Sequence, residues 1–163
     1  MKAGRPSLSD EVKRIHAAIG SYWLPGIYRD RILKTRTRAY HFGSLPKKAR
    51  VEIQHTLLGV ELKIGRRRLL CPDLATARYL SVFAQAGCDG VAIPYDITKL
   101  SCFADELESA WQRMFLLIER DLADEPRKTR IQGLIIAKLR REIAEAGAGA
   151  PIPPFKLSTK QRP

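Results

Sequence analysis

The chain of 163 residues carries a formal net charge of +12, and 45% of its residues are hydrophobic. This length and hydrophobic content suit one folded domain and exclude a chain that is disordered throughout. The charge is segregated, because residues 1–72 carry 16 Lys and Arg against 5 Asp and Glu, residues 73–125 carry 4 against 10, and residues 126–163 carry 9 against 2. A basic front, an acidic middle and a basic end favour an anionic partner such as a phosphate backbone.

Neither a secretory signal nor a membrane span is predicted. Charged residues interrupt the first 23 positions, and the longest apolar run, residues 114–118, is too short to cross a bilayer. Cys71, Cys88 and Cys102 are an odd number at wide spacing, which is typical of reduced thiols. We therefore expect a cytoplasmic protein that does not bind membranes.

The first part of the chain predicts helices. Residues 7–23 have apolar side chains at steps of three and four behind Ser7, and Pro25 with Gly26 is expected to end that helix. The cations are too dense over residues 27–42 for a buried strand and fit a solvated helix or a solvated ribbon equally, and we expect helix in the first half of that segment. Another helix is predicted over residues 45–57, capped by Ser44 and closed by Gly59, with Pro46 in its first turn. Its apolar stripe is Leu45, Ala49, Ile53 and Leu57.

The middle of the chain predicts a hairpin and then a strand, helix and strand in succession. Residues 60–64 and 67–71 flank Gly65-Arg66, and glycine at the first of two central positions is what a type II′ turn requires. A largely buried helix follows from Asp73 to Ala86, and Gly87 ends it. Residues 91–93 read as a short buried strand, which we expect to run parallel to the strand before the helix through a right-handed crossover.

Two further helices complete the predicted fold. A long helix begins between Ile97 and Ser101, and a last one begins at Pro126. The long helix has Phe103, Leu107, Trp111, Met114 and Ile118 on its apolar stripe, and the last helix has Ile131, Leu134, Ile135, Leu139 and Ile143. The sequence thus predicts an α+β, predominantly helical fold, with a small β-hairpin and one further strand packed against about five helices. Residues 1–146 are expected to form one domain with a basic arm at 1–6, followed by a disordered basic tail at 147–163.

Cations of the front block are the candidate nucleic-acid-binding residues. If the helix predicted at 45–57 and the hairpin lie side by side, these side chains form one surface able to straddle phosphates. Tyr40, His41 and Phe42 lie in the same block and are candidates for stacking on exposed bases. The candidate contacts are Arg5, Arg29, Arg31, Lys34, Arg36, Arg38, Lys47, Lys48, Arg50, Arg66, Arg67 and Arg68.

Two short motifs resemble known families. Gly4-Arg5-Pro6 resembles half of an AT-hook, whose Arg enters the minor groove, although Ala3 stands where the hook has a second Arg. Glu61-Leu62-Lys63 resembles the acidic-x-Lys element of PD-(D/E)xK nucleases, and that resemblance implies a magnesium site completed by an upstream carboxylate. The only upstream aspartates are Asp10 and Asp30, in segments assigned to helix or loop. An exposed ion pair between Glu61 and Lys63 is the simpler interpretation.

No catalytic, metal or cofactor site is predicted. The three cysteines and the histidines His16, His41 and His55 form none of the closely spaced pairs that structural zinc sites use. We therefore expect a non-catalytic regulatory protein that binds DNA or RNA through its basic front. The alternatives are a protein-interaction or adaptor module of a larger assembly, and a PD-(D/E)xK-like nuclease. The acidic helix over residues 101–124 is the candidate surface for a protein partner or a second copy of the chain.

Overall fold

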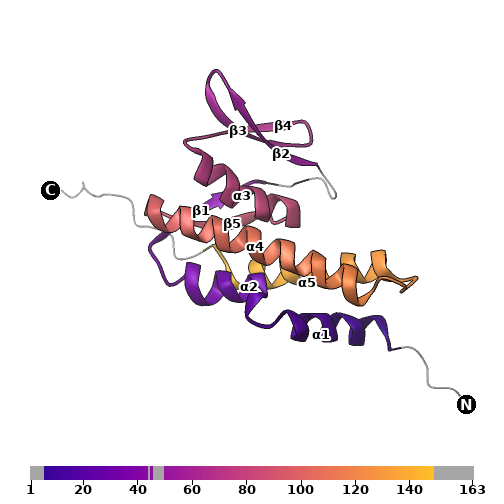
Figure 1. Cartoon of the computed structure of the whole chain (residues 1–163). Helices are drawn as coiled ribbons and strands as arrows, with labels where there is room; N and C mark the ends of the chain where they lie inside the picture. The colour runs from indigo at the N-terminus through magenta and orange to yellow at the C-terminus, as the bar shows by residue number, and fades with distance from the viewer. Residues whose placement is uncertain (1–5, 44, 46–49, 149–163) are drawn as a thin grey trace, which may run out of the picture.

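The computed structural model describes residues 6–43, 45 and 50–148. Over these residues the fold is α+β and predominantly helical, as predicted, with two small antiparallel sheets (Figure 1). The helical elements are α1 (Leu8–Ile19), the 3-10 turn η1 (Gly20–Tyr22), α2 (Leu24–Ile27), the π-helical turn η2 (Tyr28–Ile32), α3 (Leu74–Ala86), α4 (Ile97–Asp121) and α5 (Lys128–Ala146). The strands are β1 (Thr37–His41), β2 (Val51–Thr56), β3 (Gly59–Ile64), β4 (Arg67–Cys71) and β5 (Gly90–Pro94).

The N-terminal helix is shorter than predicted. The Ser7 hydroxyl caps α1 by accepting a hydrogen bond from the Asp10 amide at 3.0 Å. The helix stops at Gly20, whose φ of 61° lies in the left-handed region that favours glycine. Pro25 does not end a helix, because it lies in the first turn of α2, where its missing amide proton costs nothing. The first half of residues 27–42 is helical as expected, and the second half forms β1.

The prediction of a helix over residues 45–57 is wrong within the described residues, because residues 51–56 form strand β2. Val51, Ile53 and His55 alternate to one face, and the whole strand pairs antiparallel with β3. Pairing with β3 gives backbone groups of β2 their hydrogen-bond partners. The four-residue spacing of the predicted stripe indicated only a local preference for helix, which this pairing outweighs. Leu57, which the stripe placed in the core, is fully exposed in the turn after β2. Ser44, Pro46 and Ala49 lie outside the described residues.

The predicted hairpin is confirmed as β3 and β4, with Gly65 at a φ of 59° in the turn. It belongs to a three-stranded sheet with the order β2-β3-β4. Helix α3 packs against the inner face of this sheet, where Leu62 and Ile64 are completely buried. The helix begins as predicted, because the Asp73 carboxylate accepts a hydrogen bond from the Thr76 amide at 2.7 Å.

The predicted parallel crossover is wrong. Strand β5 exists, but it pairs antiparallel with β1 and not with β4, with Ala39 opposite Ala92. The backbone of β5 at Ala92 also forms hydrogen bonds with the hydroxyl groups of two tyrosines. The Ala92 amide donates to the Tyr28 hydroxyl at 2.9 Å, and the Tyr79 hydroxyl donates to the Ala92 carbonyl at 2.6 Å. These bonds satisfy backbone groups that would otherwise be buried without partners.

The long helix α4 packs against α3 and also against α1 and α2. Its predicted stripe is buried at Phe103, Leu107, Met114 and Ile118, and Trp111 is half-buried. Helix α3 lies between the three-stranded sheet and α4 (Figure 1). The predicted inward face of α5 is also buried except at Leu134, which is 40% exposed because it lies on the outer side of the helix.

Candidate nucleic-acid interface

The outer face of the three-stranded sheet is set by the alternation along β3. Because Leu62 and Ile64 point into the core, Glu61 and Lys63 point outward. The strand register then fixes their neighbours on both sides. Lys63 lies opposite Glu52 and Arg68, and Glu61 lies opposite Gln54 and Leu70. The outer face therefore consists of Glu52, Gln54, Thr56, Glu61, Lys63, Arg68 and Leu70.

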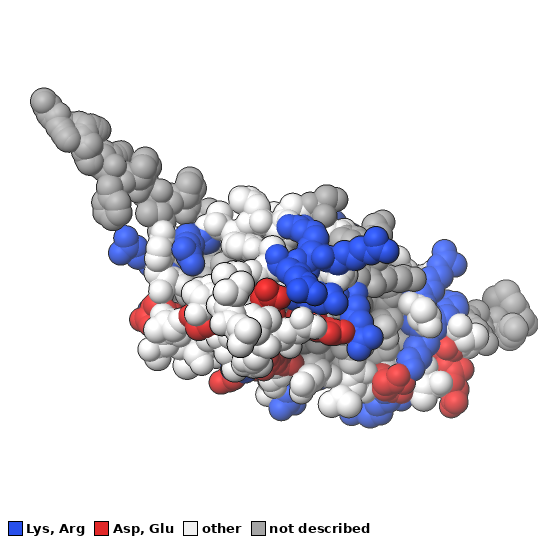
Figure 2. Space-filling model, turned by 90° about the horizontal axis from the view of Figure 1, so that it is seen from above, with Lys and Arg blue, Asp and Glu red and all other residues white. Residues whose placement is uncertain are grey.

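Five cations lie on this face or at the ends of its strands, and we call them the basic sheet surface. Figure 2, which looks down on the sheet, shows Lys and Arg side chains gathered over this part of the molecule. The Arg residues are exposed, and Lys63 is half-buried among its neighbours. The basic sheet surface comprises Arg50, Lys63, Arg66, Arg67 and Arg68.

Most of these cations are not neutralised by carboxylates. Arg50 pairs with Glu52, with 2.6 Å between Nε and Oε2, although 86% of the Arg50 side chain is exposed. The Arg68 guanidinium lies 4.0 Å from Glu61, beyond hydrogen-bonding distance. Within the described part of the chain, no ion pair holds the side chains of Lys63, Arg66 or Arg67. The surface thus keeps positive charge that a polyanion can neutralise.

Glu61 is the exception on this face. Only 15% of its side chain is exposed, and its Oε1 atom has no hydrogen-bond partner among the described residues. A carboxylate oxygen in this position can accept a hydrogen bond from a further donor.

A second group of cations lies beside strand β1. Arg36 and Arg38 both stack on the ring of Tyr95, with their guanidinium carbons 5.3 and 5.7 Å from its centroid. With Lys99 and Asp96, Arg36 and Tyr95 line a depression of about 430 Å³. We call Arg36, Arg38 and Lys99 the β1 cation cluster.

Two further front cations, Arg29 and Arg31, are engaged in contacts. Arg29 pairs with Asp30 at 3.0 Å, and this contact raises the pKa of the guanidinium and lowers the pKa of the carboxyl. Arg31 pairs with Glu106 of α4 and lies over the ring of Phe103. The contacts of Arg31 hold η2 against α4.

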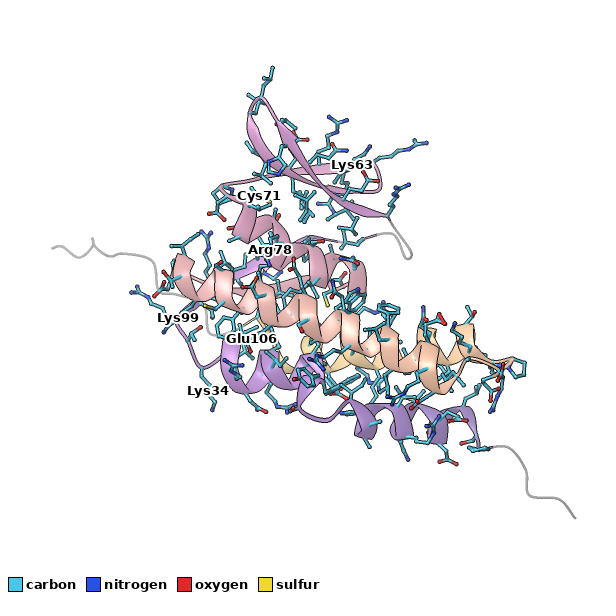
Figure 3. The ribbon with its side chains drawn as sticks, viewed as in Figure 1. Lys34, Lys63, Cys71, Arg78, Lys99 and Glu106 are labelled. Carbon is cyan, nitrogen blue, oxygen red and sulfur yellow. The ribbon has the colours of Figure 1, made fainter. Side chains whose placement is uncertain are left out.

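The predicted binding residues therefore fall into two groups rather than one footprint. Arg50, Arg66, Arg67 and Arg68 come together on the sheet. Figure 3 shows Lys63 on the sheet, Lys34 on the opposite side, and Arg78 and Glu106 between them. The structure thus separates Lys34 from the basic sheet surface. Arg29 and Arg31 lie in η2, and Arg36 and Arg38 lie at β1, which belongs to the sheet with β5 and not to the three-stranded sheet. Arg5, Lys47 and Lys48 lie outside the described residues.

Sequence reasoning missed two residues of this face. Lys63 was considered only as part of a nuclease motif, and Gln54 fell in a segment predicted as helix. Alternation of Val51, Ile53 and His55 with polar residues was the signal for a strand there. Of the aromatic residues proposed for base stacking, Phe42 is only 1% exposed and belongs to the core, in edge contact with Tyr40.

The nuclease motif has part of the expected geometry. Glu61 and Lys63 share the outer face of β3, as the resemblance requires. Asp10 lies in α1, and Asp30 lies in η2 beside Arg29. Over residues 6–43, 45 and 50–148, no group of three His, Cys, Asp or Glu side chains is placed to hold a metal ion.

The three cysteines are free thiols. Cys88 is buried, and this burial raises its pKa to about 12. Burial also raises the pKa of Cys71, whereas Cys102 is exposed on α4. A thiol with a raised pKa is a poor nucleophile at neutral pH, so Cys71 and Cys88 act as small core residues.

Among the helices of the described residues, none combines the length and apolar character needed to cross a bilayer. Comparison of the chain with protein-family models, with curated proteins and with solved structures found no match.

Proposed function

We propose that the protein binds nucleic acid without catalysis and that the basic sheet surface makes the contact. The observation that carries this proposal is a group of five cations on one sheet, of which three have no carboxylate partner among the described residues. Cations held by a folded surface release the counterions of a phosphate backbone when they bind it. A cytoplasmic location belongs to the proposal, and the three free thiols support it.

The acidic part of the molecule suits this arrangement. Helix α3 separates the sheet from α4, and Arg78 of α3 binds two carboxylates of α4 on the side away from the sheet. One of them is Glu108, with 2.6 Å between Nη2 and Oε1, and the other is Asp105. A polyanion is attracted to the sheet and repelled by the exposed carboxylates of α4, which orients it on the molecule.

Fluorescence anisotropy of labelled nucleic acid tests the proposal. The account expects binding at low salt and a linear fall of log K with log salt, with a slope set by the number of neutralised phosphates. Charge reversal of Arg66 and Arg68 to Glu should abolish binding. Reversal of Lys13, an exposed cation of α1, is the matched control and should change it little. Undiminished binding by the Arg66 and Arg68 variant would rule out the sheet as the contact.

A protein-interaction module is the second candidate, and a surface of α4 supports it. Leu116 is 69% exposed beside the half-buried rings of Trp111 and Phe115. With Gln112 and Glu119 these residues line an apolar depression of about 340 Å³. A partner retained in pull-down after nuclease treatment, and lost with Leu116→Asp, would favour this function over nucleic-acid binding.

A further inference from the structure

The outer face of the sheet differs from the surfaces that bind single strands. Proteins that bind single-stranded nucleic acid use exposed aromatic rings on which successive bases stack. The seven outward side chains of this face are two carboxylates, an amide, a hydroxyl, an ammonium, a guanidinium and a leucine, with no aromatic ring among them. This face can therefore form hydrogen bonds with the edges of bases, but it has no aromatic rings on which bases could stack.

The dimensions of the sheet match a groove of a duplex. Neighbouring strands lie about 4.8 Å apart, so the backbones of β2 and β4 lie roughly 10 Å apart on either side of β3. The major groove of B-form DNA is about 12 Å wide, and it admits β-structure. The major groove of an A-form RNA duplex is deep and narrow, so protein side chains do not reach its base edges.

The chemistry of the face is divided between its middle and one of its ends. Arg66 lies in the turn after β3, and Arg50 directly precedes β2 and its carbonyl accepts a hydrogen bond from the Gly65 amide, so both lie at the same end of the sheet, where they can contact phosphates. Lys63 and Arg68 are neighbours across β3 and β4, and such donors bind the O6 and N7 acceptors of guanine. Gln54 has the amide that pairs with adenine.

Two further groups fit base edges rather than phosphates. Leu70 is 62% exposed in the row of Gln54 and Glu61, and an apolar side chain there can contact the methyl group of thymine. The Oε1 atom of Glu61, which has no hydrogen-bond partner among the described residues, repels phosphate but can accept a hydrogen bond from the amino group of cytosine. A face built only for phosphates has no use for either group.

We infer that the ligand is double-stranded DNA, and that the outer face of β2-β3-β4 enters its major groove and contacts base edges. This inference rests on the proposed function and specifies its ligand. Lys63 and Arg68 contact guanine, and the cations at the strand ends position the duplex through its phosphates.

The test changes the DNA rather than the protein. Replacing guanine by 7-deazaguanine removes the N7 acceptor from the major groove and leaves the phosphates and the minor groove unchanged. Anisotropy is measured for a mixed-sequence duplex, its deaza form, the corresponding single strand and the RNA duplex, in about 0.1 M salt. The wild type should bind the normal duplex at least about fivefold more tightly than the deaza duplex.

A double variant, Lys63→Ala with Arg68→Ala, should bind the normal and deaza duplexes equally, and Lys13→Ala should behave as the wild type. Equal affinity of the wild type for both duplexes, or preference for the single strand or the RNA duplex, would overturn the inference and leave the proposed function standing. Absence of salt-dependent binding to every probe would remove the proposed function as well.

Discussion

The basic sheet surface and the cations around α4 have the same residue types in different surroundings. On the sheet, Arg66 and Arg67 are exposed and lack ion pairs with other described residues. Around α4, Arg31 and Arg78 bind carboxylates of the acidic middle of the chain. The charges of Arg66 and Arg67 stay exposed and without a carboxylate among the described residues, whereas the second group stabilises the fold. Net charge alone does not distinguish them, because the distinction depends on which carboxylates the fold brings near.

The largest effect is expected from removing the turn cations of the sheet. Replacing Arg66, Arg67 and Arg68 together by Ala should lower affinity for nucleic acid by about two to three orders of magnitude in 0.1 M salt, since two phosphate contacts and the base-edge contact of Arg68 are lost together. The salt slope should fall by about 2, because Arg66 and Arg67 are the phosphate contacts among the three. Anisotropy titrations over a salt series measure both quantities. An unchanged slope would place the contact elsewhere.

The paired cation Arg78 should behave in the opposite way. Its guanidinium donates to Glu108 at 3.0 Å from Nε and at 2.6 Å from Nη2, and it also binds Asp105. These contacts raise its pKa, so it stays charged. Arg78→Ala should lower the free energy of unfolding by about 1.5–3 kcal/mol, because charged hydrogen bonds between α3 and α4 are lost. Urea unfolding measures this, and Arg66→Ala is the control, expected to change stability by less than about 0.5 kcal/mol.

Tyr28 offers a smaller and pH-dependent test of the core. Its hydroxyl donates to the Gly147 carbonyl at 2.5 Å and accepts from the Ala92 amide, so Tyr28→Phe should cost about 1–3 kcal/mol at neutral pH. Burial raises the pKa of Tyr28 from about 10 to about 12. The unfolded chain therefore loses this proton first, and the stability that Tyr28 contributes should decline as pH rises from about 10 to about 12.

Urea unfolding of the wild type and of Tyr28→Phe, at neutral pH and again above pH 10, measures this decline. The difference between the two proteins should shrink at the higher pH. A difference that grows with pH would contradict the assignment of the hydroxyl as a buried neutral donor.

The smallest effect is expected at the β1 cation cluster. Arg36 and Arg38 lie over Tyr95 and apart from the sheet, so the double change of Arg36 and Arg38 to Ala should lower the salt slope by less than about 1. Anisotropy titrations over a salt series measure this change in slope together with that of the triple variant of Arg66, Arg67 and Arg68. A fall in slope equal to that of the triple variant would mean that both groups of cations bind one polyanion.

Local signals predicted most of the elements, and distant pairings account for the errors. Gly65 marks the hairpin turn, Asp73 caps α3, and Gly87 with a φ of 79° ends it. These features depend on neighbouring residues alone. Strand β2 was missed because Ile53 fits both a helical stripe and an alternating strand, and only pairing with β3 decides between them.

The topology and the site could be predicted only in part for the same reason. Strand β5 pairs with β1 across more than forty residues of chain, and no local pattern reports that partnership. The sequence identified Arg50 and Arg66 as binding candidates. It did not separate them from Arg36 and Arg38, because that separation depends on how α3 packs between the sheet and α4.

The most direct test maps the contact on the folded protein. Amide chemical shifts of isotopically labelled protein are recorded by NMR as a short duplex DNA is added. The account predicts that the perturbed amides cluster on β2, β3 and β4 around Gln54, Lys63 and Arg68, while those of α1 and α5 stay unchanged. Perturbations centred on η2 and β1, or spread evenly over the exposed cations, would contradict it.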